Sequence, residues 1–370
     1  MKILIAPNSM KGSLNAFDFA DTLEEAFLAC SSDFELRKLP VADGGDFTGE
    51  VLARSFNAHT HRLNVRGPLG KAVPSKYAIS GEKAIIEMAD ASGMKLVRSN
   101  ELNPLVASSY GTGELILDAI SKGCREILLA IGGSATVDGG MGMMEALGFQ
   151  FFDNNGIRLS GNGANLVKVQ SVVKRELPVG LKINIICDVD NPLLGKNGAA
   201  AVFGPQKGAS AEGVKELEKG LENWAKVLEE HAGKQLRTIP GMGAAGGISL
   251  PLLALLNAGI VPGADFVLEQ LQFSEQVNWA DLVITGEGKI DGQTLNNKAP
   301  FAVAKIARQL NKPVIAIGGK VEVEASEAFD GIFSLVNGPM NLEEAMQNSR
   351  HLLFNFSSQL AKLIRSLKMS

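Results

Sequence analysis

The chain has 370 residues, of which 45% are hydrophobic and 21% are charged, as in an ordinary globular protein. Because a single hydrophobic core seldom grows beyond ~250–300 residues, this length predicts two domains. The net charge is −4 with both signs interspersed, which argues against nucleic acid or a membrane surface as a partner. The three cysteines are scattered, and the N-terminal apolar stretch is too short for a signal peptide or membrane span, so we expect a cytoplasmic protein.

The N-terminal segment predicts a strand, a helix and a second strand. Lys2–Ala6 is almost wholly apolar and predicts the first strand. Between about residues 15 and 29, apolar residues recur on one helical face: Ala16, Ala20, Leu23 and Phe27. Glu35–Val41 predicts the second strand.

The middle of the chain has a different character. Short runs with Gly and Pro turns between about residues 61 and 87 predict hairpin-like strands, and hence a mixed sheet. Ile127–Ile131 and Lys182–Cys187 predict two buried strands. Val214–Glu230 predicts an amphipathic helix that ends at Gly233.

The C-terminal segment returns to alternating strands and helices. Asp281–Thr285, Pro313–Ile317 and Gly331–Val336 predict three strands, and polar glycine loops follow the first two. A last helix carries a stripe expected to face the core: Leu353, Phe356, Leu360, Leu363 and Leu367. Strands that alternate with helices favour parallel βαβ architecture.

These elements predict an α/β protein with two α/β domains. The first is a discontinuous parallel-sheet domain formed by residues 1–62 and 278–370. The second is an inserted mixed-sheet domain formed by residues 63–277. The segment 105–148 fits either domain.

The most distinctive motif is a glycine-dense elbow, IGGSATVDGG, at Ile131–Gly140. It lies between a predicted strand and a predicted helix, so bare backbone N–H groups gather at one place and suit a phosphate or carboxylate. Ser134 and Thr136 add hydroxyls, and Asp138 adds a carboxylate for a metal ion. The alternative is a tight turn in which the glycines only permit packing.

Four further loops share this polar composition, and each follows an apolar strand: PNSMKGS, VADGGDFT, CDVDNP and TGEGKIDGQT. The carboxyl ends of strands line the ligand crevice in open α/β sheets, so we expect a polar site there. Lys11, beside Ser9 and Ser13, suits a phosphate or a substrate carboxylate, with a solvated lysine as the alternative. The same two alternatives hold for Lys289.

Carboxylates in these loops are candidate metal ligands. Asp188 and Asp190 follow a strand end, where carboxylates often bind Mg²⁺, although Asp190 is favoured as a cap of the next turn. Glu287 and Asp291 are spaced across one loop and could hold a metal ion or accept ribose hydroxyls.

Several standard signatures are missing from the sequence. It contains no GxxxxGK[ST] loop and no protein-kinase HRD…DFG set, and its four histidines lie outside the glycine loops. A GxGxxG does occur at Gly241–Gly246, but neither a strong strand before it nor an acidic strand end after it is present. Close packing of small residues is therefore favoured over dinucleotide binding.

Taken together, the motifs resemble the type 1 glycerate kinase family. The strings run in the family's order over nearly the whole chain: APNSMKGSL, PVADGG, SSYGTGELI, IGGSATVDGGMGM, CDVDNPLLGKNGAA, FGPQKGAS, GAAGGI and ITGEGKIDGQTLNNKAP. The resemblance implies two α/β domains, one of them Rossmann-like. It also implies transfer of the ATP γ-phosphoryl group, with Mg²⁺, to a hydroxyl of D-glycerate, which gives a phosphoglycerate, in bacterial members 2-phosphoglycerate.

From the residues together with the resemblance, we expect the following roles in the site. Asp188, Asp43 and Lys11 are the expected catalytic residues, and Asp188 is also the candidate metal ligand. The phosphate and substrate side is expected at Ser13, Gly132, Gly133, Ser134 and Asp138. The nucleotide side is expected at Glu287, Lys289 and Asp291.

Three departures from the family pattern concern the substrate. Asn8 stands where the family usually has Asp, and Asp46-Phe47 replaces the usual Glu-Gly. Asn297 replaces a glycine. The alternatives are therefore a kinase of another small hydroxy acid, a dinucleotide-dependent oxidoreductase based on the lone GxGxxG, or a non-catalytic effector-binding protein.

Overall fold

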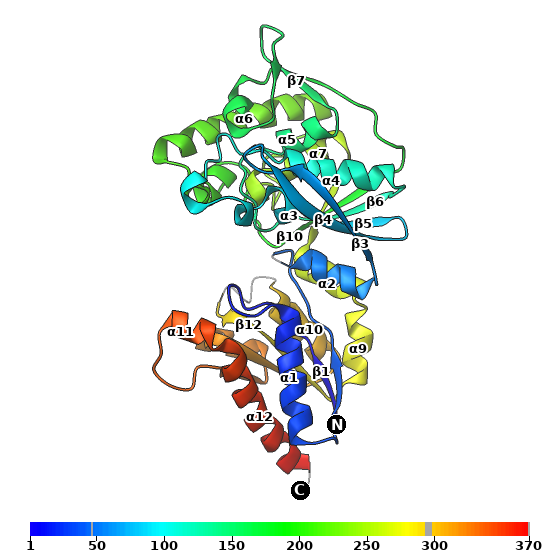
Figure 1. The fold of residues 1–370 in the computed structure, drawn as a ribbon, viewed down its shortest axis with the longest axis vertical. Helices are drawn as coiled ribbons and strands as arrows, with labels where there is room; N and C mark the ends of the chain where they lie inside the picture. Colours follow the sequence, from blue (N-terminus) through cyan, green and yellow to red (C-terminus); the bar gives the residue numbers. More distant parts are fainter. Residues whose placement is uncertain (46, 293–297, 369–370) are drawn as a thin grey trace. The chain divides into compact units, whose positions relative to one another are not determined.

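The computed structural model describes residues 1–45, 47–292 and 298–368. The chain is α/β, as predicted, and forms two compact units (Figure 1). Unit 1 contains residues 1–43 and 262–370, and unit 2 contains residues 44–261. Residues 44–62 and 262–277 thus lie on the other side of the division from the one that the sequence analysis expected, and the segment 105–148 lies in unit 2.

Unit 1 is built on a five-stranded sheet in which every neighbouring pair is parallel, in the order β14-β13-β12-β1-β2. The strands are β1 (Lys2–Ile5), β2 (Glu35–Lys38), β12 (Leu282–Ile290), β13 (Val314–Val321) and β14 (Gly331–Ser334). Counted within unit 1, this order is 2-1-3-4-5, a common doubly wound arrangement. The order reverses between β1 and β12, so the loops after these strands flank the topological switch point.

Strands β12 and β13 are longer than predicted, which corrects the polar loops expected directly after Thr285 and Ile317. Pairing continues as far as Ile290 opposite Val321, because ladder hydrogen bonds come from the backbone and do not need apolar side chains. Lys289 and Lys320 lie opposite each other in this extension. Glu322 offsets their repulsion, with Oε1 3.3 Å from the first ammonium and 2.9 Å from the second.

The helices of unit 1 are α1 (Ala16–Cys30), α8 (Gly263–Gln270), α9 (Phe273–Trp279), α10 (Ala299–Gln309), α11 (Leu342–Gln347) and α12 (Ser349–Lys368). The predicted inward face of α1 is buried, and α12 packs against α1 over one shared core (Figure 1). The stripe of α12 is only partly core-facing: Leu353 is buried, whereas Leu363 and Leu367 are 56% and 69% exposed. The 20-residue helix α12 is about 30 Å long, whereas the 15-residue helix α1 is about 22 Å long. Part of α12 therefore extends beyond α1, which leaves its side chains there exposed.

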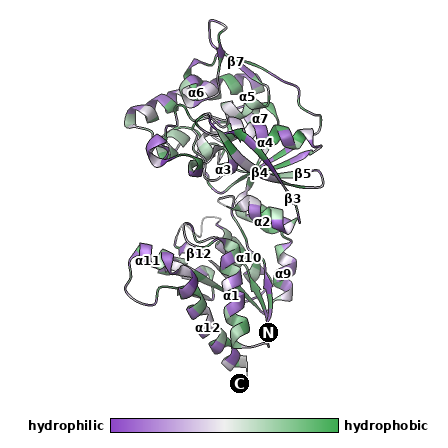
Figure 2. Cartoon of the chain, viewed as in Figure 1, coloured by the Kyte–Doolittle hydropathy of each residue, from purple (hydrophilic) through white to green (hydrophobic). Residues whose placement is uncertain are grey.

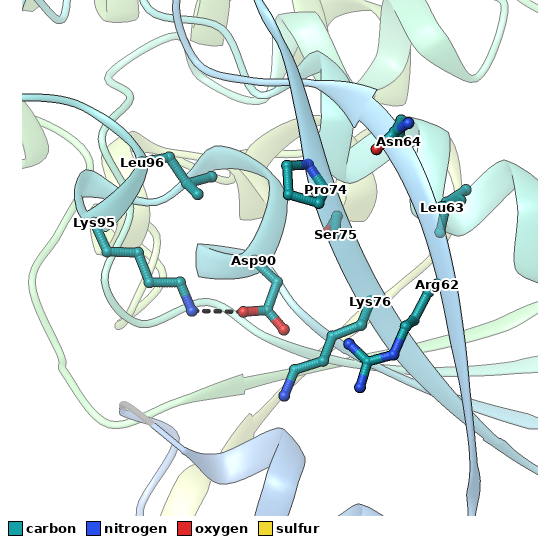
Figure 3. Close-up of a pocket in the computed structure, with 9 residues that line it drawn as sticks. All are labelled: Arg62, Leu63, Asn64, Pro74, Ser75, Lys76, Asp90, Lys95 and Leu96. Carbon is teal, nitrogen blue, oxygen red and sulfur yellow. Dashed lines mark hydrogen bonds and ion pairs between the residues drawn. The ribbon is translucent and has the colours of Figure 1, made fainter.

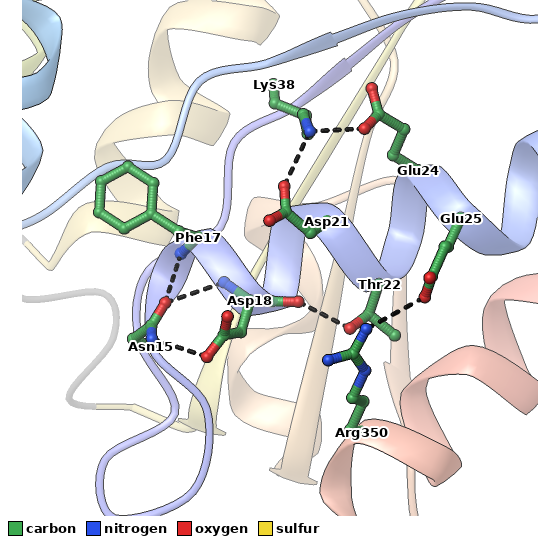
Figure 4. Close-up of polar contacts among 9 residues, drawn as sticks. All are labelled: Asn15, Phe17, Asp18, Asp21, Thr22, Glu24, Glu25, Lys38 and Arg350. Atoms are coloured by element: carbon green, nitrogen blue, oxygen red, sulfur yellow. Dashed lines mark hydrogen bonds and ion pairs between the residues drawn. The ribbon is translucent and has the colours of Figure 1, made fainter.

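Polar contacts hold the start and the exposed face of α1 (Figure 4). The Asn15 side chain accepts hydrogen bonds from the backbone N–H groups of Phe17 and Asp18, at 2.9 and 2.8 Å, and so caps the helix. On the exposed face, Lys38 of β2 pairs with Asp21 and Glu24 of α1.

Unit 2 contains a six-stranded mixed sheet in the order β11-β10-β6-β5-β4-β3, as the hairpin-like runs predicted. Its strands are β3 (His59–Arg66), β4 (Ala72–Ser80), β5 (Lys83–Glu87), β6 (Glu126–Ala130), β10 (Lys182–Cys187) and β11 (Gly259–Pro262). Strands β5, β6 and β10 are parallel neighbours, whereas β3, β4 and β5 pair antiparallel. A small antiparallel sheet adds β7 (Gln150–Phe152), β8 (Arg158–Leu159) and β9 (Ser171–Val173).

The helices of unit 2 are α2 (Thr48–Ser55), α3 (Ala89–Ser92), α4 (Tyr110–Ser121), α5 (Met141–Ala146), α6 (Ala211–Ala232) and α7 (Ser249–Leu255). Short 3-10 or π-helical segments are η1 (Met94–Leu96), η2 (Ser99–Glu101), η3 (Gly163–Lys168), η4 (Ala199–Phe203), η5 (Pro205–Lys207) and η6 (Ala244–Gly246), with η7 (Val323–Ala328) in unit 1. Helix α6 alternates hydrophilic and hydrophobic stretches (Figure 2), buries Trp224 and ends at Gly233, as predicted. None of the helices in the described ranges is long and apolar enough to cross a membrane.

Removal of the α1 cap tests how much this helix depends on Asn15. We expect Asn15→Ala to destabilise unit 1 by about 1 kcal/mol, because two N–H groups lose their acceptor. Thermal unfolding measures the effect. The matched control is Asn341→Ala, which removes the cap of α11, a helix that buries none of its residues, and should leave the melting temperature almost unchanged.

Candidate active site

Asn8 and Asp43 form a buried polar pair beside the switch point of unit 1. Asn8 follows β1, and its backbone N–H donates to the carbonyl of Gly286 in β12 at 2.8 Å. Its side-chain Nδ2 donates to Oδ2 of Asp43 at 3.0 Å, and its Oδ1 accepts from the N–H of Ser9 at 2.7 Å. The amide therefore connects both loops and fixes one carboxylate oxygen of Asp43.

Lys11 and Ser13 lie in the turn that follows this pair. The N–H of Ser13 donates to the carbonyl of Met10 at 2.9 Å, and Gly12 between them has a φ of +77°, which favours glycine. Lys11 is exposed. A Cβ on Gly288 would lie 3.6 Å from the Lys11 backbone nitrogen, so the loop after β1 packs on strand β12 at this point.

Glu287, Lys289 and Asp291 belong to β12 or directly follow it. Glu287 and Asp291 are buried, whereas Lys289 is exposed. The Lys289 ammonium lies 2.5 Å from Oδ2 of Asp291, and this hydrogen bond, with a second one to Glu322, raises the pKa of Lys289. The structure thus brings two of the three predicted nucleotide-side residues into direct contact. Gln293, Thr294 and Asn297 of this motif, like Asp46 of another, lie outside the described residues.

In unit 2, the loops after β5, β6 and β10 leave one edge of the sheet. Glu87 at the end of β5 lies opposite Ala130 of β6, and Ile186 of β10 also lies opposite Ala130. The elbow follows β6, the middle strand of the three, and therefore begins between Glu87 at the end of β5 and Asp188 after β10. Backbone hydrogen bonds tie it to the segment after α3: Met94 donates to Gly133, and Ala135 donates to Ser92, both at 2.9 Å.

Asp138 of the elbow is fully buried and accepts four hydrogen bonds. Oδ2 accepts from the N–H and the hydroxyl of Ser109, both at 2.7 Å, and from the N–H of Gly142 at 3.3 Å. Oδ1 accepts from the N–H of Gly140 at 3.2 Å. Burial raises the pKa of Asp138, and the four hydrogen-bond donors offset this rise only in part. These contacts give Asp138 the task of ordering the elbow.

Asp188 and Asp190 are exposed at the end of β10, where a metal ion or substrate could reach them. The backbone of Gly44 packs closely there, since a Cβ on Gly44 would lie 3.3 Å from the Asp188 nitrogen.

The GxGxxG segment serves close packing, as the sequence favoured. A Cβ on Gly243 would lie 2.2 Å from the carbonyl oxygen of Pro192, and one on Gly246 would lie 2.2 Å from that of Thr136. The N–H of Gly139 also donates to the carbonyl of Gly246 at 3.0 Å. The glycines thus let this segment bridge the elbow and the loop after β10, which removes the support for a dinucleotide-dependent oxidoreductase.

Two charged residues at this edge were missed by the sequence analysis. Glu87 accepts from the N–H of Gly49 at 2.8 Å, and burial, reinforced by the Asp90 charge, raises the pKa of Glu87 to about 7. Lys207 has its ammonium against the elbow, and burial lowers the pKa of Lys207 to about 7, opposed by the Asp138 charge. The sequence around each residue contains no motif that indicates a buried charge. Lys207 does belong to FGPQKGAS, one of the strings that resemble the glycerate kinase family.

A cavity of about 460 Å³ lies beside α3 on the β3–β4 hairpin (Figure 3). Arg62 and Lys76 line it from paired positions of the two strands. Lys95 and Asp90 line it from the segment after β5 and form an ion pair at 2.5 Å. Three cations against one carboxylate give this cavity a net positive lining.

The raised pKa of Glu87 predicts a pH-dependent stability. Between pH 4.5 and about 7 the folded protein holds a proton that the unfolded chain has lost, so stability falls as the pH rises through this window. We expect Glu87→Gln to raise the free energy of unfolding at pH 8 by about 1–3 kcal/mol and to change it little at pH 4.5. Melting temperatures at both pH values measure this. Glu82→Gln, at an exposed glutamate of the β4–β5 turn, is the control, and an equal shift for Glu87→Gln at both pH values would contradict the prediction.

Known proteins match this chain over nearly its whole length. The model of the glycerate kinase family matches residues 3–365. Glycerate kinase of Halalkalibacterium halodurans is 42% identical, with 97% of each chain covered. Glycerate 2-kinase of Escherichia coli is 40% identical, with 98% of this chain and 97% of the relative covered. A crystal structure of a Salmonella typhimurium protein assigned as glycerate kinase 2 matches with a TM-score of 0.88 at 38% identity, and both chains are fully covered. The chain is therefore a kinase that belongs to the glycerate kinase family.

Proposed function

We propose that this protein transfers the γ-phosphoryl group of ATP to a hydroxyl of D-glycerate and forms 2-phosphoglycerate. The observation that carries the proposal is the concentration of buried polar side chains at the switch point of unit 1, where doubly wound sheets bind their ligands. The 40% identity to a relative named glycerate 2-kinase, over nearly the whole of both chains, supports the substrate and the position of the phosphate. Because the donor is ATP, we place the reaction in the cytoplasm.

Phosphoryl transfer suits the groups that the chain offers. The reaction needs positioning and stabilisation of charge on the phosphoryl oxygens, and little covalent help from the protein. Lys11 and Ser13 would bind a phosphate or the glycerate carboxylate, and Gly132, Gly133 and Ser134 would bind phosphate oxygens. Glu287, Lys289 and Asp291 would serve the nucleotide side.

The acceptor hydroxyl must lose its proton as the new bond to phosphorus forms, and Asp43 and Asp188 are the proposed proton acceptors. Asp43 has the better-defined position, because Asn8 fixes one of its oxygens. Asp188 has the greater exposure and so the easier access to a small acid.

The donor set also fits Mg²⁺, which usually takes one or two carboxylates and fills its other positions with water and phosphate oxygens. Within the described ranges no group of three or more His, Cys, Asp or Glu residues is placed to hold a metal ion. Asp188 or Asp43 would hold the ion together with the nucleotide. Bound there, Mg²⁺ would neutralise charge on the phosphate oxygens.

Phe47 favours a second candidate, the phosphorylation of another small hydroxy acid. It precedes α2 with a φ of 67°, in the left-handed region, and its side chain is 41% exposed. A bulky exposed ring at this loop would alter an acceptor pocket formed there.

A coupled assay of ADP release with Mg-ATP and a panel of small hydroxy acids tests the proposal. We expect D-glycerate to give the highest kcat/KM. Enolase added to the product, without and with phosphoglycerate mutase, distinguishes 2-phosphoglycerate from 3-phosphoglycerate. No ADP release with D-glycerate would refute the proposal, and a higher kcat/KM for another acid would favour the second candidate.

Substitution of Asp188 tests its role in the reaction. We expect Asp188→Asn to lower kcat by ~10²–10⁴-fold, the range for loss of a general base, with the melting temperature unchanged because the side chain is exposed. Asp190→Asn is the matched control, two residues away and also exposed, and should retain activity. Near-normal turnover of Asp188→Asn would remove Asp188 from the catalytic set.

A further inference from the structure

Lys207 is a lysine buried in the interior of unit 2. It is 2% exposed and ends η5, directly before Gly208. Gly208 has a φ of +93°, and a Cβ there would lie 2.2 Å from the carbonyl oxygen of Leu102. The turn therefore admits only glycine at this position, and it fixes where the lysine enters the core. Lysine is almost never fully buried unless it is paired, so the groups around the ammonium determine its role.

The polar partners of Lys207 all belong to the glycine elbow. Nζ donates to Oγ of Ser134 and to the backbone carbonyl oxygen of Thr136, both at 2.7 Å. The Asp138 carboxylate supplies the opposite charge that acts on the ammonium. A single buried cation thus holds the elbow from the inside, 71 to 73 residues away in the sequence.

These contacts determine what the Ser134 hydroxyl can do. Nζ of Lys207 donates to Oγ of Ser134, so Oγ is the acceptor and its hydrogen points elsewhere. Within the described residues the structure gives that hydrogen no protein acceptor. The N–H that Lys207 donates polarises the hydroxyl and makes it a stronger donor. Ser134 is 4% exposed, and the neighbouring Gly132 and Gly133 are half-buried, so the elbow reaches the surface at this end.

We propose that Lys207 is a positioning residue for phosphate recognition: it holds Ser134 Oγ so that the hydroxyl donates to an oxygen of a phosphate group bound on the elbow at Gly132 and Gly133. The inference rests on the proposed function, in which the elbow binds phosphate oxygens. It adds the buried residue that prepares the elbow for this task. Lys207 itself touches only the elbow, and Ser134 makes the contact with the ligand.

The first arm of the test addresses the hydroxyl alone, in the same ADP-release assay. We expect Ser134→Ala to lower kcat by ~10²-fold, the scale for loss of one preorganised donor, with KM for D-glycerate changed by less than about threefold. Ser134→Thr keeps the hydroxyl and should retain most of the activity. The matched control is Thr136→Val, because the Thr136 hydroxyl is buried without a hydrogen-bond partner in the described part of the chain and should be dispensable.

The second arm tests the coupling between Lys207 and Ser134. Lys207→Met should lower kcat to a similar extent, and the double variant should be no slower than Lys207→Met alone, because both changes remove one donor. Lys207→Gln, which keeps an amide donor, replaces Lys207→Met if the latter does not fold. A purely structural lysine would instead lower the melting temperature and give kinetic effects that multiply.

The outcomes separate this inference from the proposed function. Wild-type activity in Ser134→Ala, or independent effects in the double variant, would overturn the inference and leave glycerate phosphorylation intact. An unmodified protein that releases no ADP with D-glycerate would refute the proposed function, and the inference would fall with it. The Ser134 variants leave the buried lysine in place, so wild-type activity of Ser134→Ala overturns the inference even if neither Lys207 variant folds.

Discussion

One buried carboxylate organises the polar edge of unit 2. Asp138 takes hydrogen bonds from Ser109 at the start of α4 and from Gly140 and Gly142 at the start of α5. A carboxylate with no exposure is stable only when such donors replace water. Because the donors come from two helices and the elbow itself, the position of the elbow follows from satisfying this single charge. The ammonium of Lys207 and the bridging glycine segment then attach to a loop that is already fixed.

Unit 1 also contains a buried carboxylate, Asp43, that is held by a hydrogen bond from the protein. The Asn8 amide donates to Asp43 at 3.0 Å, at a position where the sequence analysis expected an aspartate from the family resemblance. A second carboxylate at this distance would place like charges in contact and favour protonation of one of them. The amide of Asn8 instead donates a hydrogen bond and adds no charge, which suits a site proposed to hold anionic ligands.

Much of this could be predicted from the sequence, because the information is local. Apolar strand runs, the 3.6-residue periodicity of α1 and α6, and the glycine after α6 gave the elements and the α/β class. The ends of β12 and β13 could not be predicted, since their extension depends on pairing between glycine- and lysine-containing segments far apart in the chain. Lys207 was not predicted for the same reason. Its partners lie more than 70 residues away, and the local sequence PQKG does not indicate a buried charge. Asp138 was predicted on the phosphate and substrate side of the site. Its four hydrogen-bond donors come together only in the folded chain, and through them it orders the elbow.

The insertion of unit 2 into unit 1 has a consequence for synthesis on the ribosome. β1 is made first, yet its neighbour β12 begins only at Leu282, after the whole of unit 2 has been translated. At ~5–20 residues per second this delay is of the order of tens of seconds. During that interval unit 2 can complete its own sheet, while β1 has only β2 as a strand neighbour and α1 lacks α12 to pack against. The nascent N-terminal segment therefore keeps apolar surface exposed until late in synthesis, and the last strands to emerge complete the sheet that the first one began.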